Sequence, residues 1–465
     1  MRARLKVKLS HWKSRCLEKT KCKRNLSARL QRSEQQVTRL KAENARLRAI
    51  TEPQPVAYHL YPAQMIAMAV FIVSHAGGSL RCAAKTVAFL SEMMGWKYAQ
   101  PSPVTIRNWV LRCGLYQLDY AKVKAGQYVG IIDESIQIGR EKLLLLLGVK
   151  LRDTWSHAAP LMMNDVEVLG VEVQQRWPGD KVAEFIKKRL AHHKEIDLRY
   201  VISDQGTNLL SALRMLSIPA VSDCSHMMMN VVKKLFSNNK QLSALAAQMG
   251  QFRRKFLLTE LGYLLPPTLR DKDRFLRIFT LVEWNNRIQA YWNKLPPKHR
   301  TPLSFLQQAQ PLLQCVGQIK TLAVLTAHLL KSAGLSSASQ RKWETSIAQY
   351  SQTTTLTAEA NTFLNTVRQY FASHAELIGS HEHLLCCSDI IESTFGRYKN
   401  KGGMQVISAD VLSIALYSQP LTTDFIQKAL NTVHQKHIEQ WKKQYTCHNR
   451  YSILRRMDQE LKSVA

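Results

Sequence analysis

A carboxylate in the middle of an apolar strand is the feature that most constrains this chain. Residues 128–139 read Tyr-Val-Gly-Ile-Ile-Asp-Glu-Ser-Ile-Gln-Ile-Gly, an apolar segment of strand type with Asp133 and Glu134 at its centre. Acidic side chains are depleted in strands and are rarely buried without a partner. A metal ion is the commonest partner, so we expect Asp133 to be the first ligand of a divalent-metal site. Glu134 lies on the opposite strand face, and we expect it to take no part.

Charge is the strongest signal in the composition. The 465 residues include 65 Lys and Arg against 34 Asp and Glu, a formal net charge of +31. Such an excess favours polyanionic partners, whose binding is driven by counterion release. We therefore expect a nucleic-acid partner, with a membrane-surface or ribosome-associated protein as the alternative.

The length and the apolar pattern predict a protein of several domains that does not span a membrane. The chain is long enough for two to four domains. The longest apolar runs, 65–73 and 143–149, fall well short of the roughly 20 residues of a membrane span. No signal peptide is visible, and nine cysteines without CxxC spacing are typical of reduced thiols. We expect a cytoplasmic protein, associated with the nucleoid if the source is prokaryotic.

Residues 1–50 predict a basic coiled-coil or interaction helix. The first 25 residues are rich in Lys and Arg, and a heptad pattern then places these residues at alternating d and a positions: Leu26, Leu30, Ser33, Val37, Leu40, Asn44 and Leu47. An Asn at an a position favours one register in a dimer. A basic region before a zipper resembles the bZIP layout, although three heptads are few. The alternative is a solvated, partly ordered tail.

Residues 59–120 predict a helix-turn-helix-like DNA-binding domain. Three short helices are expected at 63–74, 80–94 and 104–115, and in this arrangement the last helix enters the major groove. Arg107 and Asn108 are the residue types that contact guanine and adenine edges. The alternative is that the three helices are only a packing unit.

Strands and helices alternate between residues 126 and 226. Strands are expected at 127–138, 142–151, 166–174, 199–204 and 219–222, with helices at 181–192 and 207–216. Three strands followed by helix, strand, helix and strand is the order of a ribonuclease-H-like core. Residues 227–385 predict an all-α insertion, residues 386–405 the last core helix, and residues 406–465 a basic helical tail. The expected fold class is therefore multidomain α+β, with an α/β core interrupted by a large helical insertion.

Two further acids complete the candidate metal site. Asp204 ends the fourth strand, where α/β sheets present functional groups, although an Asx turn before Gly206 would also explain it. Glu392 lies on the helix after the insertion; its alternative is a capping box with Asp389, which is the rival third ligand. Lys399 follows Glu392 by nearly two helical turns and shares its face. Three oxygen ligands with open positions suit two Mg²⁺ or Mn²⁺ ions that bridge phosphate oxygens.

These motifs resemble the Asp-Asp-Glu (DDE) triad of insertion-sequence transposases. The matching segments are Ile-Ile-Asp133, Val-Ile-Ser-Asp204-Gln-Gly and Ile-Ile-Glu392-Ser-Thr-Phe-Gly-Arg-Tyr-Lys399, within residues 60–405. The resemblance implies a ribonuclease-H-like fold, divalent metal, cleavage at transposon ends and strand transfer into target DNA. The Tyr and Arg that precede Glu in some groups are replaced by Leu385 and Ser388, which leaves the subgroup open.

A second segment, Asp223-Cys-Ser-His226, is similar to the Cys/Asp-x-x-His element of transposases that carry a helical insertion. The resemblance places His226 near the scissile phosphate, and a histidine satisfied at a helix start is the alternative. Arg397 and Lys401 are expected to contact the DNA backbone.

Two weaker patterns lie in or beside the insertion. Trp284 and Trp292 could stack on a flipped base, but tryptophans at helical spacing are more often core. His381, His383, Cys386 and Cys387 have loose zinc-ligand spacing without a matching pair, so we expect no zinc there.

The sequence thus predicts a DNA transposase that acts on double-stranded DNA as a homodimer or a higher synaptic assembly, without a membrane partner. One alternative is a domesticated, transposase-derived DNA-binding protein without catalysis. The other is a structure-selective nuclease of the same fold.

Overall fold

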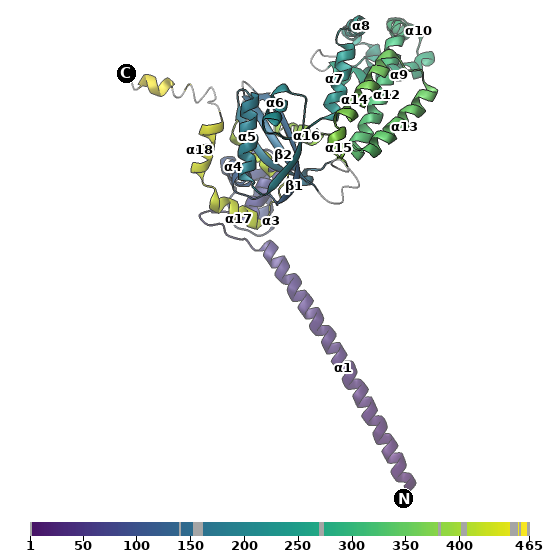
Figure 1. Cartoon of the computed structure of the whole chain (residues 1–465). Helices are drawn as coiled ribbons and strands as arrows, with labels where there is room; N and C mark the ends of the chain where they lie inside the picture. The colour runs from purple at the N-terminus through teal and green to yellow at the C-terminus, as the bar shows by residue number, and fades with distance from the viewer. Residues whose placement is uncertain are drawn as a thin grey trace.

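The computed structural model of the chain describes residues 2–138, 141–151, 161–268, 274–379, 383–400 and 407–446, together with residues 454 and 457–462. It is an α+β protein with one five-stranded mixed sheet, so the predicted coarse class is confirmed. Figure 1 shows a body built around the sheet, a separate helical body beside it, and a long N-terminal helix that projects away from both.

The sheet combines an antiparallel meander with two parallel strands. Its strands are β1 (Gly126–Ile138), β2 (Glu141–Lys150), β3 (Val166–Gln174), β4 (Ile196–Ser203) and β5 (Ala220–Ser222), in the order β3-β2-β1-β4-β5. β1, β2 and β3 pair antiparallel, whereas β4 runs parallel to β1 and β5 runs parallel to β4. The parallel strands are connected through α5 (Gly179–His192) and α6 (Thr207–Met215). β1 is therefore an interior strand between β2 and β4.

Alternation along β1 places its side chains in two separate cores. Ile131 packs with Leu145 in the core that continues into the helical body. Ile132 packs on the other face with Phe185 of α5 and Leu213 of α6. Asp133 pairs with Leu145, so it lies on the face of Ile131, and Glu134 lies on the face covered by α5 and α6. The period of two in a strand thus directs the two acids to different environments.

Four helices precede the sheet. They are α1 (Arg2–Thr51), α2 (Ala63–Ser74), α3 (Leu80–Met93) and α4 (Pro103–Asp119). α1 is helical from its start, including the first 25 residues, for which the sequence shows no heptad pattern. Ser79 and Ser102 cap α3 and α4 by accepting hydrogen bonds from backbone amides, and Pro103 occupies the first turn of α4, where no amide hydrogen is needed.

In the segment between α6 and α16 (Asp389–Lys399), the described residues form helices and connecting loops, with no strand pairing apart from β5 and one isolated bridge between Leu335 and Leu384. Its longer helices are α7 (Cys224–Phe236), α8 (Lys240–Phe256), α9 (Arg274–Tyr291), α12 (Gln310–Ala333), α13 (Ser337–Thr353) and α14 (Ala358–Ser373). The shorter ones are η2 (Glu260–Leu264), η4 (Trp292–Lys294), α10 (Pro297–Arg300), η5 (Thr301–Leu303), α11 (Phe305–Gln308) and α15 (Ala375–Gly379). Among the described helices, only α12 is long and apolar enough to cross a membrane, and half of its most apolar 18-residue window is buried inside the protein.

The chain after α16 contributes to the core, which differs from the expected basic tail. The η6 helix (Ala409–Leu416) is buried throughout except for Asp410, and it packs on α4. Its apolar residues divide between two cores: Val411 and Ile414 face the core of the sheet, and Leu416 joins the core of α2, α3 and α4. α17 (Thr423–Thr432) and α18 (Gln435–Tyr445) then pack against the same helices. The predicted helix-turn-helix-like unit therefore shares its core with the C-terminal segment.

Candidate active site

Two of the three predicted acids lie side by side because of strand register. The parallel pairing of β1 with β4 ends at Ile132 and Ser203, and the next residues are Asp133 and Asp204. Neighbouring strands lie about 4.8 Å apart, so the two carboxylates leave adjacent strands at the same level. The Oδ1 of Asp204 also accepts a hydrogen bond from the Gly206 amide at 3.0 Å. The Asx turn considered from the sequence is thus present, and it fixes the carboxylate beside Asp133.

The electrostatics of Asp133 show that the acids influence one another. Burial, together with the negative charges of Asp204 and, more weakly, Glu392, raises the pKa of Asp133 to about 7, although the nearby His226 lowers it. Like charges placed together raise a carboxyl pKa in this way because the ionised forms repel. A divalent cation held between such groups removes that repulsion, which fits the oxygen donors that Mg²⁺ prefers.

The third acid reaches the site through α16, which packs against β1. The Nε2 of His226 donates a hydrogen bond to the Oε1 of Glu392 at 3.3 Å. This bond, with the nearby Asp223 and Asp204, raises the pKa of His226 to about 9. The structure therefore brings together Asp133, Asp204, Glu392 and His226, which come from two strands and two helices.

A buried carboxylate holds these two helices in place. Asp223 is fully buried, and its Oδ1 accepts a hydrogen bond from the His226 amide at 2.6 Å, which caps α7. Its Oδ2 accepts hydrogen bonds from the Ser388 amide at 2.6 Å and the Ser388 hydroxyl at 2.9 Å, immediately before α16. The Cys224 amide also donates to the Cys386 carbonyl at 2.8 Å. The two ends of the helical insertion thus meet at one point, which sets the distance between His226 and Glu392.

The rival ligand Asp389 is engaged elsewhere. Its Oδ2 forms an ion pair with Lys331 of α12, and its Oδ1 accepts a hydrogen bond from Ser225 at 3.4 Å. Of the two acids in the first turn of α16, Glu392 is the one that contacts His226 and acts on Asp133.

Glu134 has a structural environment that the sequence did not indicate. It forms an ion pair with Lys142 of β2 and accepts a hydrogen bond from the Asn208 amide group at 2.7 Å. Asn208 also donates to the Trp177 carbonyl at 2.9 Å, so Glu134 ties the start of α6 to β1. These residues and Asp204 line an open cleft of about 1070 Å³. Glu134 is therefore a support for the Asp204 turn rather than an unconnected residue.

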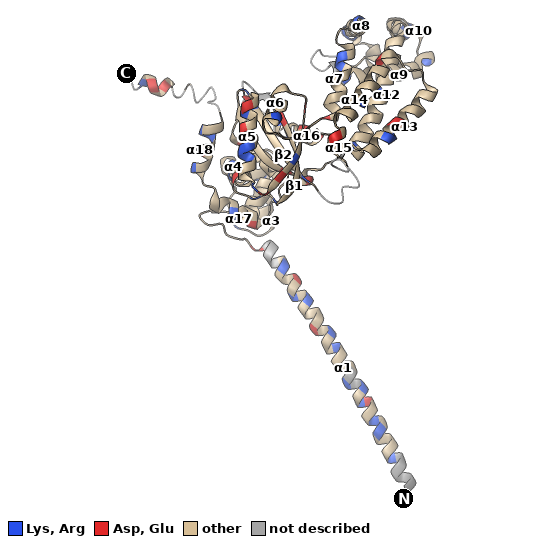
Figure 2. Cartoon of the chain, viewed as in Figure 1, with Lys and Arg blue, Asp and Glu red and all other residues tan. Residues whose placement is uncertain are grey.

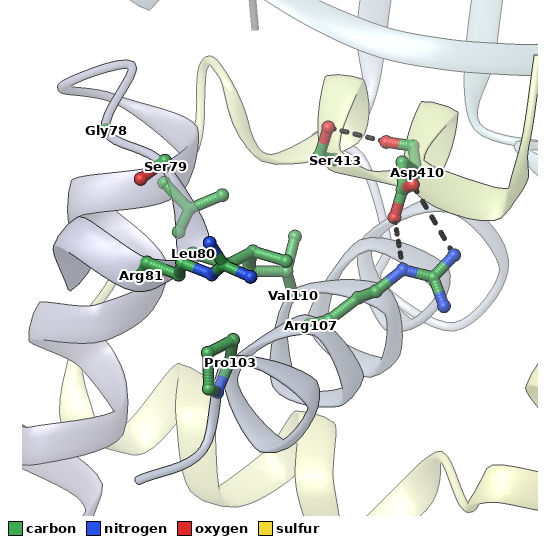
Figure 3. Close-up of a pocket in the computed structure, with 10 residues that line it drawn as sticks. Gly78, Ser79, Leu80, Arg81, Pro103, Arg107, Val110, Asp410 and Ser413 are labelled. Atoms are coloured by element: carbon green, nitrogen blue, oxygen red, sulfur yellow. Dashed lines mark hydrogen bonds and ion pairs between the residues drawn. The ribbon is translucent and has the colours of Figure 1, made fainter. Parts of the chain in front are cut away.

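The predicted base-reading residue Arg107 is engaged in an ion pair. Its Nε donates to the Oδ1 of Asp410 at 2.9 Å, and a second guanidinium nitrogen lies 3.4 Å from Oδ2 (Figure 3). The pair lies in a pocket of about 370 Å³ between α3, α4 and η6, which also includes Arg81 and Ser413. Asn108 is partly exposed on α4. Arg107 thus joins α4 to the C-terminal segment in this structure, a contact between residues too far apart in sequence to be predicted.

The basic residues of α16 differ in their surroundings. Arg397 donates a hydrogen bond to the His75 carbonyl, and its guanidinium lies 4.6 Å from the centre of the Tyr417 ring. Lys399 is exposed at the end of α16. Arg397 therefore connects α16 to the ends of α2 and η6, whereas the side chain of Lys399 is open to solvent. Lys401 lies outside the described residues.

The two tryptophans considered in the insertion pack in or against its core. Trp284 is 3% exposed and donates its indole hydrogen to the Leu264 carbonyl at 3.1 Å, so it lies in the core, the commoner of the two roles considered for it from the sequence. Trp292 is partly buried against the same core. His381 lies outside the described residues, and His383 is partly buried.

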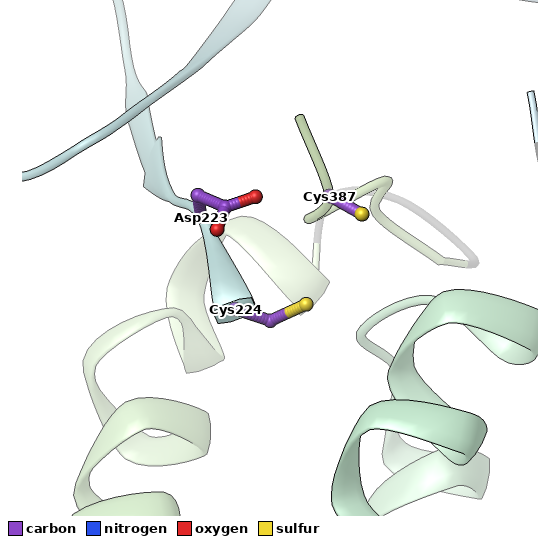
Figure 4. A group of neighbouring side chains, drawn as sticks. All are labelled: Asp223, Cys224 and Cys387. Carbon is purple, nitrogen blue, oxygen red and sulfur yellow. The ribbon is translucent and has the colours of Figure 1, made fainter. Parts of the chain in front are cut away.

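Asp223, Cys224 and Cys387 form the one group of potential metal ligands, among the described residues, whose ligand atoms all lie within 4.8 Å of one another (Figure 4). Asp133, Asp204 and Glu392 do not form so tight a group. However, both oxygens of Asp223 already accept hydrogen bonds. The contact with the Cys386 thiol and burial raise the pKa of Cys224 well above its usual range, and the contact with the Cys224 thiol and burial do the same for the pKa of Cys387. Protonated thiols are poor metal ligands. We interpret this group as packing at the base of the insertion.

Comparison with known proteins gives no family for the chain. No protein-family model matches it, and no curated protein matches it significantly.

Proposed function

We propose that this protein is a DNA transposase of a mobile element, with a DDE-type active site in a ribonuclease-H-like core. One observation carries the proposal: strand register places Asp133 beside Asp204, and an insertion closed by Asp223 returns Glu392 to the same place. The strand order and strand directions of the sheet support the fold assignment. A cytoplasmic location follows from a DNA substrate.

In this mechanism Asp133, Asp204 and Glu392 would hold two Mg²⁺ or Mn²⁺ ions. When bound, such ions activate the attacking oxygen and stabilise the leaving oxygen of an in-line phosphoryl displacement. Water would attack the phosphorus at the element end and displace the 3′-oxygen, which leaves as a free 3′-hydroxyl. In the second step this hydroxyl would lose its proton, attack a phosphorus of the target DNA and displace a target 3′-hydroxyl. The protonated His226 imidazolium faces Glu392 and supplies positive charge next to the scissile phosphate, which stabilises negative charge that develops there.

The remaining partners follow from charge and exposure. Lys399, exposed on the Glu392 helix, would contact the adjacent phosphate, and Lys401 would extend this contact. The unit of α2, α3 and α4 would bind the terminal repeats through Asn108 and the exposed start of α4, with Arg107 joining once it leaves Asp410. Pairing of two element ends calls for a homodimer or a larger synaptic assembly.

A labelled duplex that carries the DNA flanking the coding region tests the proposal. The wild-type protein with Mg²⁺ should nick this duplex, and Asp204→Asn should bind it equally well but cut at least 100-fold more slowly. Glu392→Gln should behave in the same way, whereas Asp389→Asn, on the same helix turn, should retain cleavage. Normal cutting by Asp204→Asn would refute the metal assignment.

The same experiment separates the two alternative functions. A domesticated DNA-binding protein would bind without metal-dependent cleavage in the wild type. A structure-selective nuclease would cut branched duplexes of unrelated sequence as well as the flanking DNA, and it would not join the freed 3′ end to a second duplex.

A further inference from the structure

The N-terminal helix α1 is long, exposed and separate from the rest of the chain. Its 50 residues correspond to about 75 Å of helix, and Figure 1 shows it extending away from the body that contains the sheet. Every residue from 8 to 47 whose burial is described is exposed, except the partly buried Cys16. An isolated helix in water gains little stability from its own hydrogen bonds. A helix of this length and exposure therefore needs a partner along its surface.

One face of α1 carries an apolar stripe with coiled-coil spacing. Leu26 and Leu40 occupy d positions, and Leu30 and Val37 occupy a positions; each side chain is between 46% and 62% exposed. Because these positions repeat every 3.5 residues on average, they lie along one seam that a second helix can cover.

We propose that this seam pairs with the same seam of a second copy of the chain, as a parallel, in-register coiled coil over residues 26–44. Asn44 at an a position meets its own copy only in a parallel, in-register pair, where the two amides can hydrogen-bond. The same register places Arg29, at a g position, opposite Glu34 of the second copy, at an e position, and this pair is attractive. This dimer would join two transposase subunits, and only this role rests on the proposed function.

The sequence of α1 also sets where the coiled coil ends. Continuing the same heptads towards the N-terminus places Lys19 at a d position and Lys23 at an a position. In a dimer these positions would bring four ammonium groups into one turn of the seam, which like-charge repulsion opposes. The two helices therefore separate before residue 23, and their N-terminal halves diverge as basic arms. The described basic residues of each arm are Lys8, Lys13, Arg15, Lys19, Lys21 and Lys23, and Figure 2 shows Lys and Arg spread along this helix.

Disulfide trapping in the full-length chain tests the orientation and register. In a background with Cys16→Ser, Cys22→Ser, Cys82→Ser and Cys447→Ser, which leaves four buried cysteines and the partly buried Cys387, Leu30→Cys and Val37→Cys are oxidised separately with oxidised glutathione. Each should give a disulfide-linked dimer as the main species on a non-reducing gel. An antiparallel pair can align position 30 or position 37 with itself, but not both. The matched control Gln35→Cys, at an outward f position of the same turn, should stay mostly monomeric.

Two further measurements address the extent and the strength of the seam. Restoring Cys16, which continues the a positions into the basic arm, should give at least tenfold less dimer than Val37→Cys. Leu40→Lys should turn the wild-type dimer into monomer in sedimentation velocity at the same protein concentration. Equal crosslinking at 35 and 37, no crosslinking at either 30 or 37, or a Leu40→Lys protein that remains dimeric would each overturn the proposal.

These assays use neither DNA nor metal. A dimer that crosslinks as expected but does not cut DNA would refute the proposed function alone. Metal-dependent cutting by a protein that does not crosslink at 30 and 37 would refute the coiled coil alone.

Discussion

Replacing Asp223 by alanine should loosen the junction between α7 and α16 without unfolding the protein. The substitution removes three hydrogen bonds from a fully buried carboxylate: one from the His226 amide and two from Ser388. Loss of a helix cap costs about 1 kcal/mol. The buried donors of Ser388, left without an acceptor, cost about 1–3 kcal/mol more. The expected local loss is therefore about 2–4 kcal/mol, which a domain of ordinary stability survives.

Native-state hydrogen exchange measures this loss at the residues concerned. A loss of about 2–4 kcal/mol corresponds to exchange on the order of 30- to 700-fold faster at the amides of His226 and Ser388, since each 1.4 kcal/mol is a factor of ten. Cleavage of the flanking duplex should fall as well, because His226 and Glu392 are carried by the two loosened helices. Asp389→Asn is the matched control: it removes a partly exposed ion pair with Lys331, worth about 0–1 kcal/mol. Exchange at Ser388 that changes no more in Asp223→Ala than in Asp389→Asn would refute this reasoning.

Three other perturbations have defined outcomes. Gly114→Ala should destabilise the protein by about 1–3 kcal/mol in urea unfolding, because the added Cβ would lie 2.2 Å from the Leu412 carbonyl oxygen. The control Gly396→Ala, whose added Cβ would have no atom within 4 Å, should be neutral or stabilising by up to about 1 kcal/mol. Equal losses of stability in the two variants would contradict the packing of α4 on η6. In the folded protein the pKa of Asp133 is raised to about 7, so ionisation of this carboxyl opposes folding. Without metal, the free energy of unfolding of the wild type should therefore fall relative to that of Asp133→Asn as the pH rises from 4 to 7. Parallel curves of unfolding free energy against pH for the two proteins would refute this. Mg²⁺ at pH 8 should raise the melting temperature of the wild type and not that of Asp133→Asn, and an equal rise in both would place the ion elsewhere.

The sheet and the pairing of its two acids follow from local sequence patterns. The apolar segments around Asp133 and Asp204 show strand character. Asp133 lies within β1 and Asp204 directly follows β4, and the two acids are level because the parallel pairing of these strands ends just before both of them. Glu134 could be separated from Asp133 by the strand period alone, but its bonds to Lys142 and Asn208 depend on how α6 approaches the sheet. Strand alternation can be read from neighbouring residues, whereas the contacts of Glu134 depend on the tertiary structure.

The contacts that the sequence did not reveal join distant segments. Asp410 belongs to a short apolar helix, and apolar composition alone does not indicate which segment the helix packs against. Nothing in its sequence therefore identifies Arg107 as the partner of Asp410. The same holds for Asp223 and Ser388, which are joined only because the insertion returns to its starting point. Continuous helix in α1 also extends beyond the region where a heptad indicates it, because Lys and Arg favour helix as well as leucine does.

The meeting of the insertion's two ends has a consequence for biosynthesis. Asp204 leaves the ribosome about 190 residues before Glu392, which at ordinary elongation rates is on the order of 10–40 s. During that interval the nascent chain has the first two acids but lacks the third, and the Oδ2 of Asp223 lacks its hydrogen-bond donor Ser388. Under the proposed function, the nascent chain would be unable to cut DNA until Glu392 has been synthesised and α16 docks on β1.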